Sequence, residues 1–196
     1  MTDPPFDYHD YHRTIVAFHG TTAEIAGDLV DGQPFRVSSN TDDWLGSGAY
    51  FWEYAPKQAW WWAREFKRYP RPAVVGAMIR LGNCFDLLDP ANVRLLKDVH
   101  DVMPEKWAAS GSKIPRNGNQ HKNLDCAVFN ELYLRAEARR KPIDSARAVY
   151  VPTESAKRVW ARSWIYEEAH IQINVRNQKN ILAVWHVGPD GRYGRR

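Results

Sequence analysis

Residues 170–175 place the strongest constraint on how this chain can fold. They read His-Ile-Gln-Ile-Asn-Val, a strict alternation of polar and apolar side chains. Because successive side chains of a strand point to opposite faces of a sheet, His170, Gln172 and Asn174 share one face and the three aliphatic residues share the other. The segment therefore predicts a strand with one polar and one apolar face. Exposure to solvent is the simplest explanation of the polar face.

The order of the other predicted elements indicates an α+β fold. Strands dominate both ends of the chain and helices the middle, which favours a domain with mostly antiparallel strands. Thr21 and Glu24 have the spacing of a capping box at the start of the first helix. The predicted strands are 15–18, 49–52, 73–81, 146–151, 170–175 and 181–187, and the predicted helices are 21–30, 56–67, 90–103 and 124–140.

Length and composition narrow the class of protein. The 196 residues fit one domain over 1–196. The longest apolar runs fall far short of the roughly 20 residues that a membrane span needs, and the acidic, aromatic N-terminus does not resemble a secretory signal. Cys84 and Cys126 form no CxxC pattern, so we expect neither a disulfide framework nor a zinc site. A chain without disulfides is typical of the reducing cytoplasm, so we expect a cytoplasmic location.

Positive charge gathers in the last third of the chain. Residues 135–196 hold 13 Lys/Arg against 6 Asp/Glu, whereas residues 1–134 hold 14 against 17. A basic region of this kind favours a polyanionic partner such as nucleic acid, although a solvated basic surface would look the same.

Three segments combine residue types that could form a ligand site. Phe18-His19-Gly20-Thr21-Thr22 follows a predicted strand, and its histidine could hold a ligand while the glycine backbone approaches closely. Residues 44–52 join a tight glycine turn to an aromatic residue, Tyr50. The third segment is 170–175. Taken singly, they could equally be a structural histidine, an ordinary hairpin and an exposed sheet face.

In this order, the three segments resemble the ADP-ribosyltransferase superfamily, specifically the branch of diphtheria toxin and the poly-ADP-ribose polymerases, which carries a His–Tyr–Glu triad. The H-G-[ST] motif of that branch matches His19-Gly20-Thr21, and its G-x-G-x-Y-F motif matches Gly46–Phe51 at every fixed position. A second aromatic residue eleven positions after the tyrosine corresponds to Trp61. The resemblance implies a split, mostly antiparallel sheet with flanking helices, and residues 85–145 would be a helical and loop insertion.

Gln172 stands near the position of the family's catalytic glutamate, about nine residues before Ile181. Glutamine can still hydrogen-bond the nicotinamide-ribose hydroxyl but brings no charge to the forming oxocarbenium ion. Two candidates remain for the third catalytic residue. One is Gln172 itself, as in a similar group of presumed bacterial transferases whose last core strand reads H-I-Q-I. The other is Glu168, which shares the alternation of Gln172 if the strand begins that early.

The resemblance implies an enzyme that uses NAD⁺ as a substrate and needs no metal. The family's histidine holds the adenosine-side ribose, its glycine backbone pairs with the carboxamide, and two aromatic rings sandwich the nicotinamide. Hydroxyl groups nearby would add contacts. A nucleophile of the target then attacks the anomeric carbon. The expected NAD⁺ contacts in this chain are His19, Gly20, Thr21, Ser47, Gly48, Tyr50 and Trp61.

The basic last third favours nucleic acid over protein as the target. A small transferase of this kind is similar to bacterial toxins of toxin–antitoxin or phage-defence systems, which implies an antitoxin as a further partner. The alternatives are a protein-modifying transferase, an enzyme like the RNA 2′-phosphotransferases, and a non-catalytic NAD⁺-binding module. The expected target contacts are Arg135, Arg139, Arg140, Lys141, Arg147, Lys157, Arg158 and Arg162.

Overall fold

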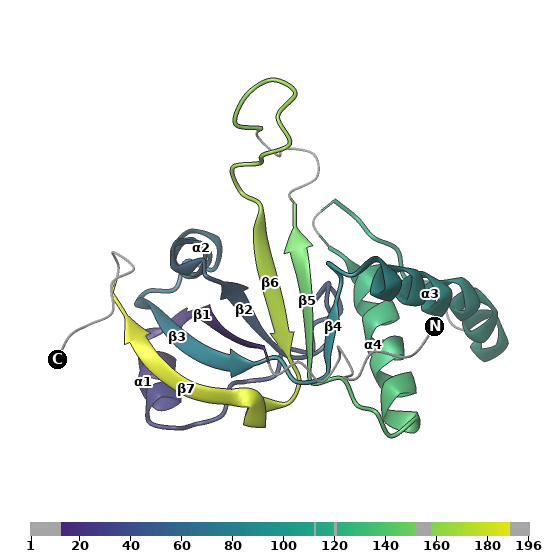
Figure 1. Cartoon of the computed structure of the whole chain (residues 1–196), viewed down its shortest axis with the longest axis horizontal. Helices are drawn as coiled ribbons and strands as arrows, with labels where there is room; N and C mark the ends of the chain where they lie inside the picture. The colour runs from purple at the N-terminus through teal and green to yellow at the C-terminus, as the bar shows by residue number, and fades with distance from the viewer. Residues whose placement is uncertain (1–12, 112, 120, 152–157, 189–196) are drawn as a thin grey trace, which may run out of the picture.

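The computed structural model describes residues 13–111, 113–119, 121–151 and 158–188. Within these ranges the chain forms seven strands and four α-helices (Figure 1). The strands are β1 (Thr14–Thr22), β2 (Ala49–Glu53), β3 (Pro72–Arg80), β4 (Cys84–Asp86), β5 (Ser145–Tyr150), β6 (His170–Val175) and β7 (Ile181–Val187). The helices are α1 (Ala23–Val30), α2 (Pro56–Trp61), α3 (Pro90–Ser110) and α4 (Asn123–Ala138), with a π-helical turn (Trp62–Phe66) after α2 and a 3-10 turn (Gln178–Asn180) before β7.

The described strands make one sheet in the order β4-β5-β6-β2-β1-β3-β7. Every neighbouring pair is antiparallel except β4–β5. The prediction of an α+β fold with a mostly antiparallel sheet is therefore confirmed. Nine residue pairs join β1 to β3, but in the described structure only two, Ala17–Glu53 and Phe18–Trp52, join β1 to β2. The sheet is thus weakly joined between β1 and β2, next to His19.

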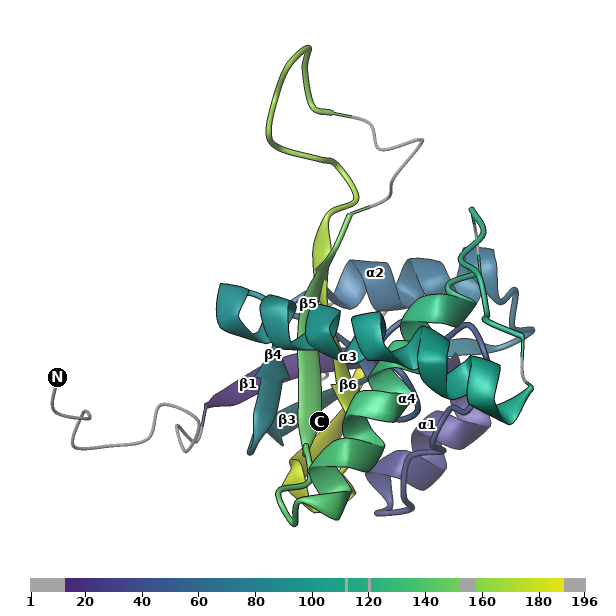
Figure 2. The ribbon, with the colours of Figure 1, turned by 90° about the vertical axis from the view of Figure 1, so that its right-hand side faces the viewer.

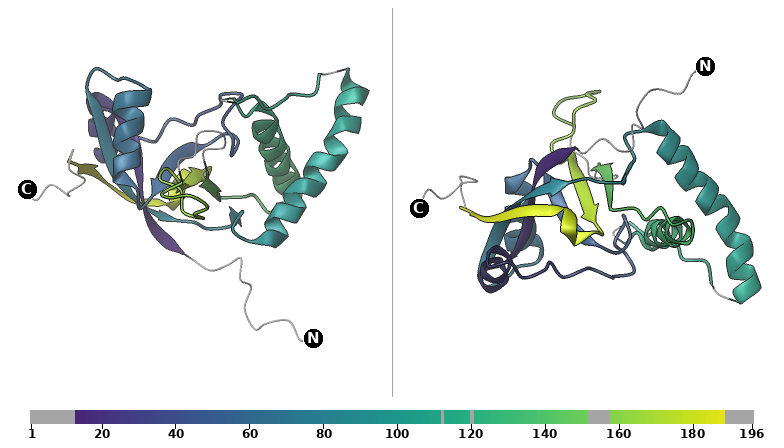
Figure 3. Two further views of the ribbon diagram at one scale, coloured as in Figure 1. Left: turned by 90° about the horizontal axis from the view of Figure 1, so that it is seen from above. Right: turned by 60° about the horizontal axis from the view of Figure 1, so that its bottom comes forward.

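Different helices cover the two faces of the sheet. On the core face, α1 packs against β1, β3 and β7; the apolar core on this face includes Ala17, Phe51 and Ile173. The opposite face, which we call the site face, carries Tyr50, Trp52, Gln172 and Asn174 of β2 and β6. Its β1–β3 end is covered by α2 and its β4–β5 end by α3 and α4, and Figure 3 shows these two groups of helices at opposite ends of the sheet. The site face of β2 and β6 lies between them.

A long connection leaves the sheet between β5 and β6. Its described part, residues 158–169, which we call the β5–β6 loop, extends away from the helices in Figures 1 and 2. The backbones of Arg158 and Tyr166 pair as an isolated antiparallel β-bridge at its base. Beyond this bridge the loop exposes large apolar side chains, with Trp160 62% and Trp164 90% exposed.

Several element boundaries differ from the prediction. β1 continues through His19–Thr22, which we expected to be a turn, because β3 pairs with it along its whole length. The N-cap residue of α1 is Thr22, whose side chain accepts a hydrogen bond from the backbone N–H of Ile25, and not Thr21. α3 runs seven residues beyond the predicted end at 103. β4 was missed, since three residues carry too little periodicity and its partner β5 is distant in the sequence.

Among the helices of the described ranges, none has both the length and the apolar character required to cross a membrane.

Candidate functional site

His19 and Tyr50 are in direct contact where the β1–β2 ladder ends. The Nδ1 atom of His19 lies 2.8 Å from the carbonyl oxygen of Tyr50. A carbonyl can only accept, so Nδ1 carries the proton and Nε2 is the acceptor of the neutral ring. The imidazole packs against Phe35 and Phe51 on the core face, whereas the Tyr50 side chain belongs to the site face. The two residues are therefore adjacent, but their rings leave the sheet on opposite faces.

The backbone of Gly20 faces the same edge of the sheet. The carbonyl of Val16 accepts a hydrogen bond from the backbone N–H of Tyr54 in β2's continuation, at 3.1 Å. Alternate residues of a strand direct their N–H and C=O groups to the same side, so Gly20 also directs its groups toward β2. Because the ladder ends at Phe18–Trp52, these two groups lie beyond the last pair. A donor–acceptor group such as a carboxamide matches them.

Gly20 also lets α2 approach β1 closely. A Cβ atom at this position would lie 2.4 Å from the carbonyl oxygen of Ala59 and 3.2 Å from the Cβ of Ala63. Any side chain would push α2 away from the sheet. The glycine of the His-Gly-Thr segment is thus required by packing as well as by the proposed ligand contact.

The glycine-rich loop before β2 is held rigidly by buried polar groups. The amide nitrogen of Asn174, a fully buried residue, donates to the carbonyls of Leu45 and Gly46 at 2.6 and 2.9 Å. The Tyr50 hydroxyl donates to the Gly46 carbonyl at 2.8 Å and accepts from the Leu45 N–H at 3.0 Å. Burial raises the pKa of Tyr50 above its usual value, so the phenol stays neutral.

Gln172 is the centre of a hydrogen-bond chain on the site face. Its Oε1 accepts from the indole N–H of Trp44 at 2.7 Å, and its Nε2 lies 3.0 Å from Nε2 of His170. Since an indole can only donate, this contact fixes the orientation of the amide, and His170 Nε2 must be the acceptor. His170 Nδ1 then donates to the carbonyl of Glu168 at 2.7 Å, and Tyr150 stacks on the imidazole.

These hydrogen bonds require the His170 ring to be neutral. Burial lowers the pKa of His170 below its ordinary value of 6.5, against the opposing effect of the Glu168 carbonyl. A histidine whose folded-state pKa is lowered contributes stability above pH 6.5 that is lost as the pH falls through the folded-state value. His19 behaves in the same way, because burial also lowers its pKa. Acidification should therefore disrupt the contact between Gln172 and His170 Nε2, whereas His19 Nδ1 can donate to the Tyr50 carbonyl in either protonation state.

We expect Gln172→Glu to raise the pKa of His170, since a carboxylate beside Nε2 favours the imidazolium. An NMR titration of the His170 ring protons measures this change. Gln58→Glu on α2 adds the same charge away from β6 and is the matched control. An identical His170 titration in Gln172→Glu and in the parent protein would contradict the contact.

The three consecutive tryptophans at the end of α2 and the start of the π-helical turn, Trp60, Trp61 and Trp62, do not lie as the spacing predicts. Trp61 is 50% exposed and its ring lies 6.2 Å from that of Phe66. The neighbouring Trp62 instead packs against Trp52 of β2, with ring centroids 5.5 Å apart. Ala59 and Ala63 face the sheet, so helical geometry turns Trp62 toward the site face and Trp61 toward solvent. Trp62 is better placed than Trp61 to contact a ligand beside β2.

Thr21 and Ser47, whose hydroxyl groups were predicted to contact NAD⁺, are either buried or bonded to other residues of the protein. Thr21 pairs with Ala73 and is 4% exposed. Ser47 accepts from the Arg176 guanidinium at 3.1 Å, and its backbone N–H donates to Asn130 of α4 at 2.9 Å. A Cβ on Gly48 would lie 1.5 Å from Asn174 Oδ1. In this structure Ser47 and Gly48 hold the loop against β6 and α4.

Glu168 lies outside the strand. β6 begins at His170, and Glu168 is an exposed turn residue of the β5–β6 loop. The alternation that would have aligned its side chain with Gln172 therefore does not reach it. Gln172, on the site face opposite Trp52, is the residue that the structure brings next to β2.

The predicted target-binding residues do not form a single basic face. Arg147 is engaged inside the protein by Glu53, at 2.6 Å, and by Asp86, at 3.2 Å, with its side chain 12% exposed; we withdraw it as a target contact. Arg135 pairs with Glu131. The exposed residues Arg139, Arg140 and Lys141 lie before β5, at the opposite end of that strand from the β5–β6 loop. Arg158 and Arg162 belong to the loop itself, and Lys157 lies outside the described residues.

Sequence reasoning missed three features that shape the site. Trp44 bonds to Gln172, Tyr150 stacks on His170, and Asn174 holds the glycine-rich loop through its amide nitrogen. The alternation in 170–175 put Asn174 on the same face as Gln172, but its carbonyl partners are more than 120 positions away. Trp44 precedes the glycine turn without any periodic signal. Comparisons with protein-family models, curated proteins and solved structures find no match to this chain.

Proposed function

We propose that this chain is an NAD⁺-dependent mono-ADP-ribosyltransferase with one ADP-ribosyltransferase-like domain over residues 1–196. The observation that supports it most is the arrangement at the open end of the β1–β2 ladder. There the imidazole of His19 bonds to the strand of Tyr50, the backbone groups of Gly20 face the same edge, and Gln172 lies on the adjacent strand. These residues come from the three segments that carry the family resemblance.

In the proposed reaction, the bond between the ribose anomeric carbon and nicotinamide breaks, and its electron pair leaves with nicotinamide. A nucleophile of the target bonds to the anomeric carbon and loses a proton. Nicotinamide is a cationic leaving group, so positioning and charge stabilisation carry most of the work. Gly20 would hold the carboxamide, His19 a ribose, and Gln172 Oε1 would accept a ribose hydroxyl through its second lone pair.

A non-catalytic NAD⁺-binding module is the second candidate, because the Gln172 amide is uncharged and already bonded to Trp44 and His170. Calorimetric titration with NAD⁺ and assay of free nicotinamide separate the two. Binding with nicotinamide release supports the transferase, and binding without release in the presence of RNA, DNA and protein supports the module. Absence of NAD⁺ binding would overturn both.

We favour nucleic acid as the target. The β5–β6 loop leaves the sheet beside Gln172 and His170, and it combines the cationic Arg158 and Arg162 with the exposed rings of Trp160 and Trp164. Base stacking on aromatic rings and phosphate neutralisation by arginine are the usual means of binding single strands. A protein-modifying transferase would use the same loop through its apolar side chains.

Binding to a single-stranded oligonucleotide should weaken steeply with salt, because counterions are released. We expect Arg162→Ala to make the slope of log K against log salt shallower by about 0.7, the contribution of one phosphate contact on a single strand. Fluorescence anisotropy at several salt concentrations measures the slope. Arg139→Ala, at the other end of β5, is the control. Equal slopes for the two variants, or salt-independent binding, would favour a protein target.

A further inference from the structure

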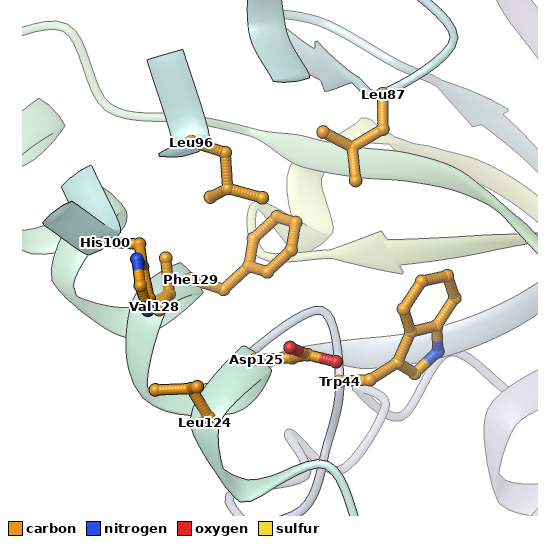
Figure 4. Close-up of a pocket in the computed structure, with 8 residues that line it drawn as sticks. All are labelled: Trp44, Leu87, Leu96, His100, Leu124, Asp125, Val128 and Phe129. Atoms are coloured by element: carbon orange, nitrogen blue, oxygen red, sulfur yellow. The ribbon is translucent and has the colours of Figure 1, made fainter. Parts of the chain in front are cut away.

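A half-open cavity of about 360 Å³ lies between α3, α4 and the loop that precedes β2 (Figure 4). Its walls are mostly apolar, with the rings of Trp44 and Phe129 and the side chains of Leu96 and Val128. The volume falls within the range of roughly 300–1,000 Å³ typical of small-molecule sites. Trp44 belongs both to this cavity and to the hydrogen-bond chain of Gln172, so one indole separates the cavity from the candidate catalytic residue.

Asp125 and His100 line the otherwise mostly apolar cavity, and Asp125 gives it a directional acceptor. Figure 4 shows its carboxylate on the same side as Trp44, with Leu87 and Leu96 across from them. Oδ1 accepts a hydrogen bond from the Asn117 amide at 2.7 Å, and within the described part of the chain Oδ2 has no hydrogen-bond partner. Asp125 lies in the first turn of α4, where the helix dipole stabilises a negative charge. Asp125 lines the cavity, so its carboxylate places a hydrogen-bond acceptor at the cavity wall.

We propose that this cavity binds a nucleobase that carries an exocyclic amino group, and that it holds the base of the acceptor across the Trp44 indole from Gln172. A flat heterocycle suits a cavity bordered by two aromatic rings, and an amino group would donate to Asp125 Oδ2. The occupant follows from the cavity, whereas its role as the acceptor rests on the proposed transferase function. A purely apolar ligand would leave Oδ2 desolvated without a partner, which is costly.

The test is direct binding of adenosine, cytidine and uridine, measured by calorimetry without NAD⁺. We expect adenosine and cytidine to bind at least tenfold more tightly than uridine, which has no exocyclic amino group. In Asp125→Asn, the Asn117 contact holds Oδ1 and places an amide NH₂ where Oδ2 stood. This near-isosteric change turns the acceptor into a donor and should reverse the preference in favour of uridine. Asp28→Asn on α1, which packs on the core face, should change nothing.

A second variant tests the location. Leu96→Trp should fill the cavity and abolish nucleoside binding, while Leu95→Trp, at an exposed neighbouring position, should retain it; circular dichroism checks the fold of both. Absence of nucleoside binding, or binding that is indifferent to Asp125 and Leu96, would overturn the proposal. Nicotinamide release without nucleoside binding would leave the transferase function standing, and nucleoside binding without nicotinamide release would leave the cavity assignment standing.

Discussion

Replacing Gly48 with alanine is expected to destabilise the chain by about 2–4 kcal/mol, at the upper end of overpacking costs. The new Cβ would lie 1.5 Å from Asn174 Oδ1 and 3.0 Å from the Val175 carbonyl oxygen. Asn174 cannot move aside, because it is fully buried and its amide nitrogen bonds the carbonyls of Leu45 and Gly46. The free energy of unfolding in urea measures the effect.

Gly27→Ala is the matched control for this measurement. Gly27 lies inside α1, and a Cβ there would meet no atom within 4 Å. The alanine should therefore stabilise the chain by up to about 1 kcal/mol through helix propensity. Equal free energies of unfolding for the two alanine variants would show that β6 does not approach the glycine turn as closely as described.

Gln172→Ala is expected to lower ADP-ribose transfer at least tenfold while NAD⁺ binding persists. A hydrogen bond made in the transition state is worth about 1 to a few kcal/mol, and about 1.4 kcal/mol corresponds to tenfold in rate. The alanine also removes the acceptor of the Trp44 indole, so a thermal unfolding curve must accompany the assay. Gln172→Glu should keep transfer or divert it toward NAD⁺ hydrolysis, since a carboxylate also activates water.

Glu168→Gln is the control for the catalytic assignment. Glu168 is exposed in the β5–β6 loop, and it is hydrogen-bonded to His170 through its backbone carbonyl, which this change leaves in place. Most activity should therefore remain. Loss of transfer in Glu168→Gln with retention in Gln172→Ala would move the third catalytic position to Glu168. If neither change affected a protein that still bound NAD⁺, the binding-module alternative would be favoured.

Local patterns predicted the elements of this fold more reliably than their ends. The alternation of 170–175 gave β6 its correct bounds, and Pro56 marked the start of α2. Tertiary pairing decided the rest. β1 extends through Gly20 because β3 pairs with it, and β4 exists because β5 lies beside it. No local signal reports either partner.

The candidate site shows the same division. Motif order predicted that His19, Tyr50 and Trp61 would line one cleft. His19 does contact the backbone carbonyl of Tyr50, but the two rings leave the sheet on opposite faces and Trp61 is half exposed. A count of basic and acidic residues along the sequence could not predict that Arg147 is neutralised by Glu53 and Asp86, since those partners lie 94 and 61 positions away. The sequence also could not show which of the three consecutive tryptophans faces β2, because that depends on how α2 packs against β1 at Gly20.

The most direct test of the central claim is incubation of the protein with NAD⁺ labelled in the adenylate moiety, together with separate pools of RNA, DNA and protein. The account predicts release of nicotinamide and covalent label on a nucleic acid pool, reduced at least tenfold in Gln172→Ala. Label on protein alone would keep the transferase and change its target. Intact NAD⁺ in every pool, from a protein that is folded by circular dichroism, would contradict the account.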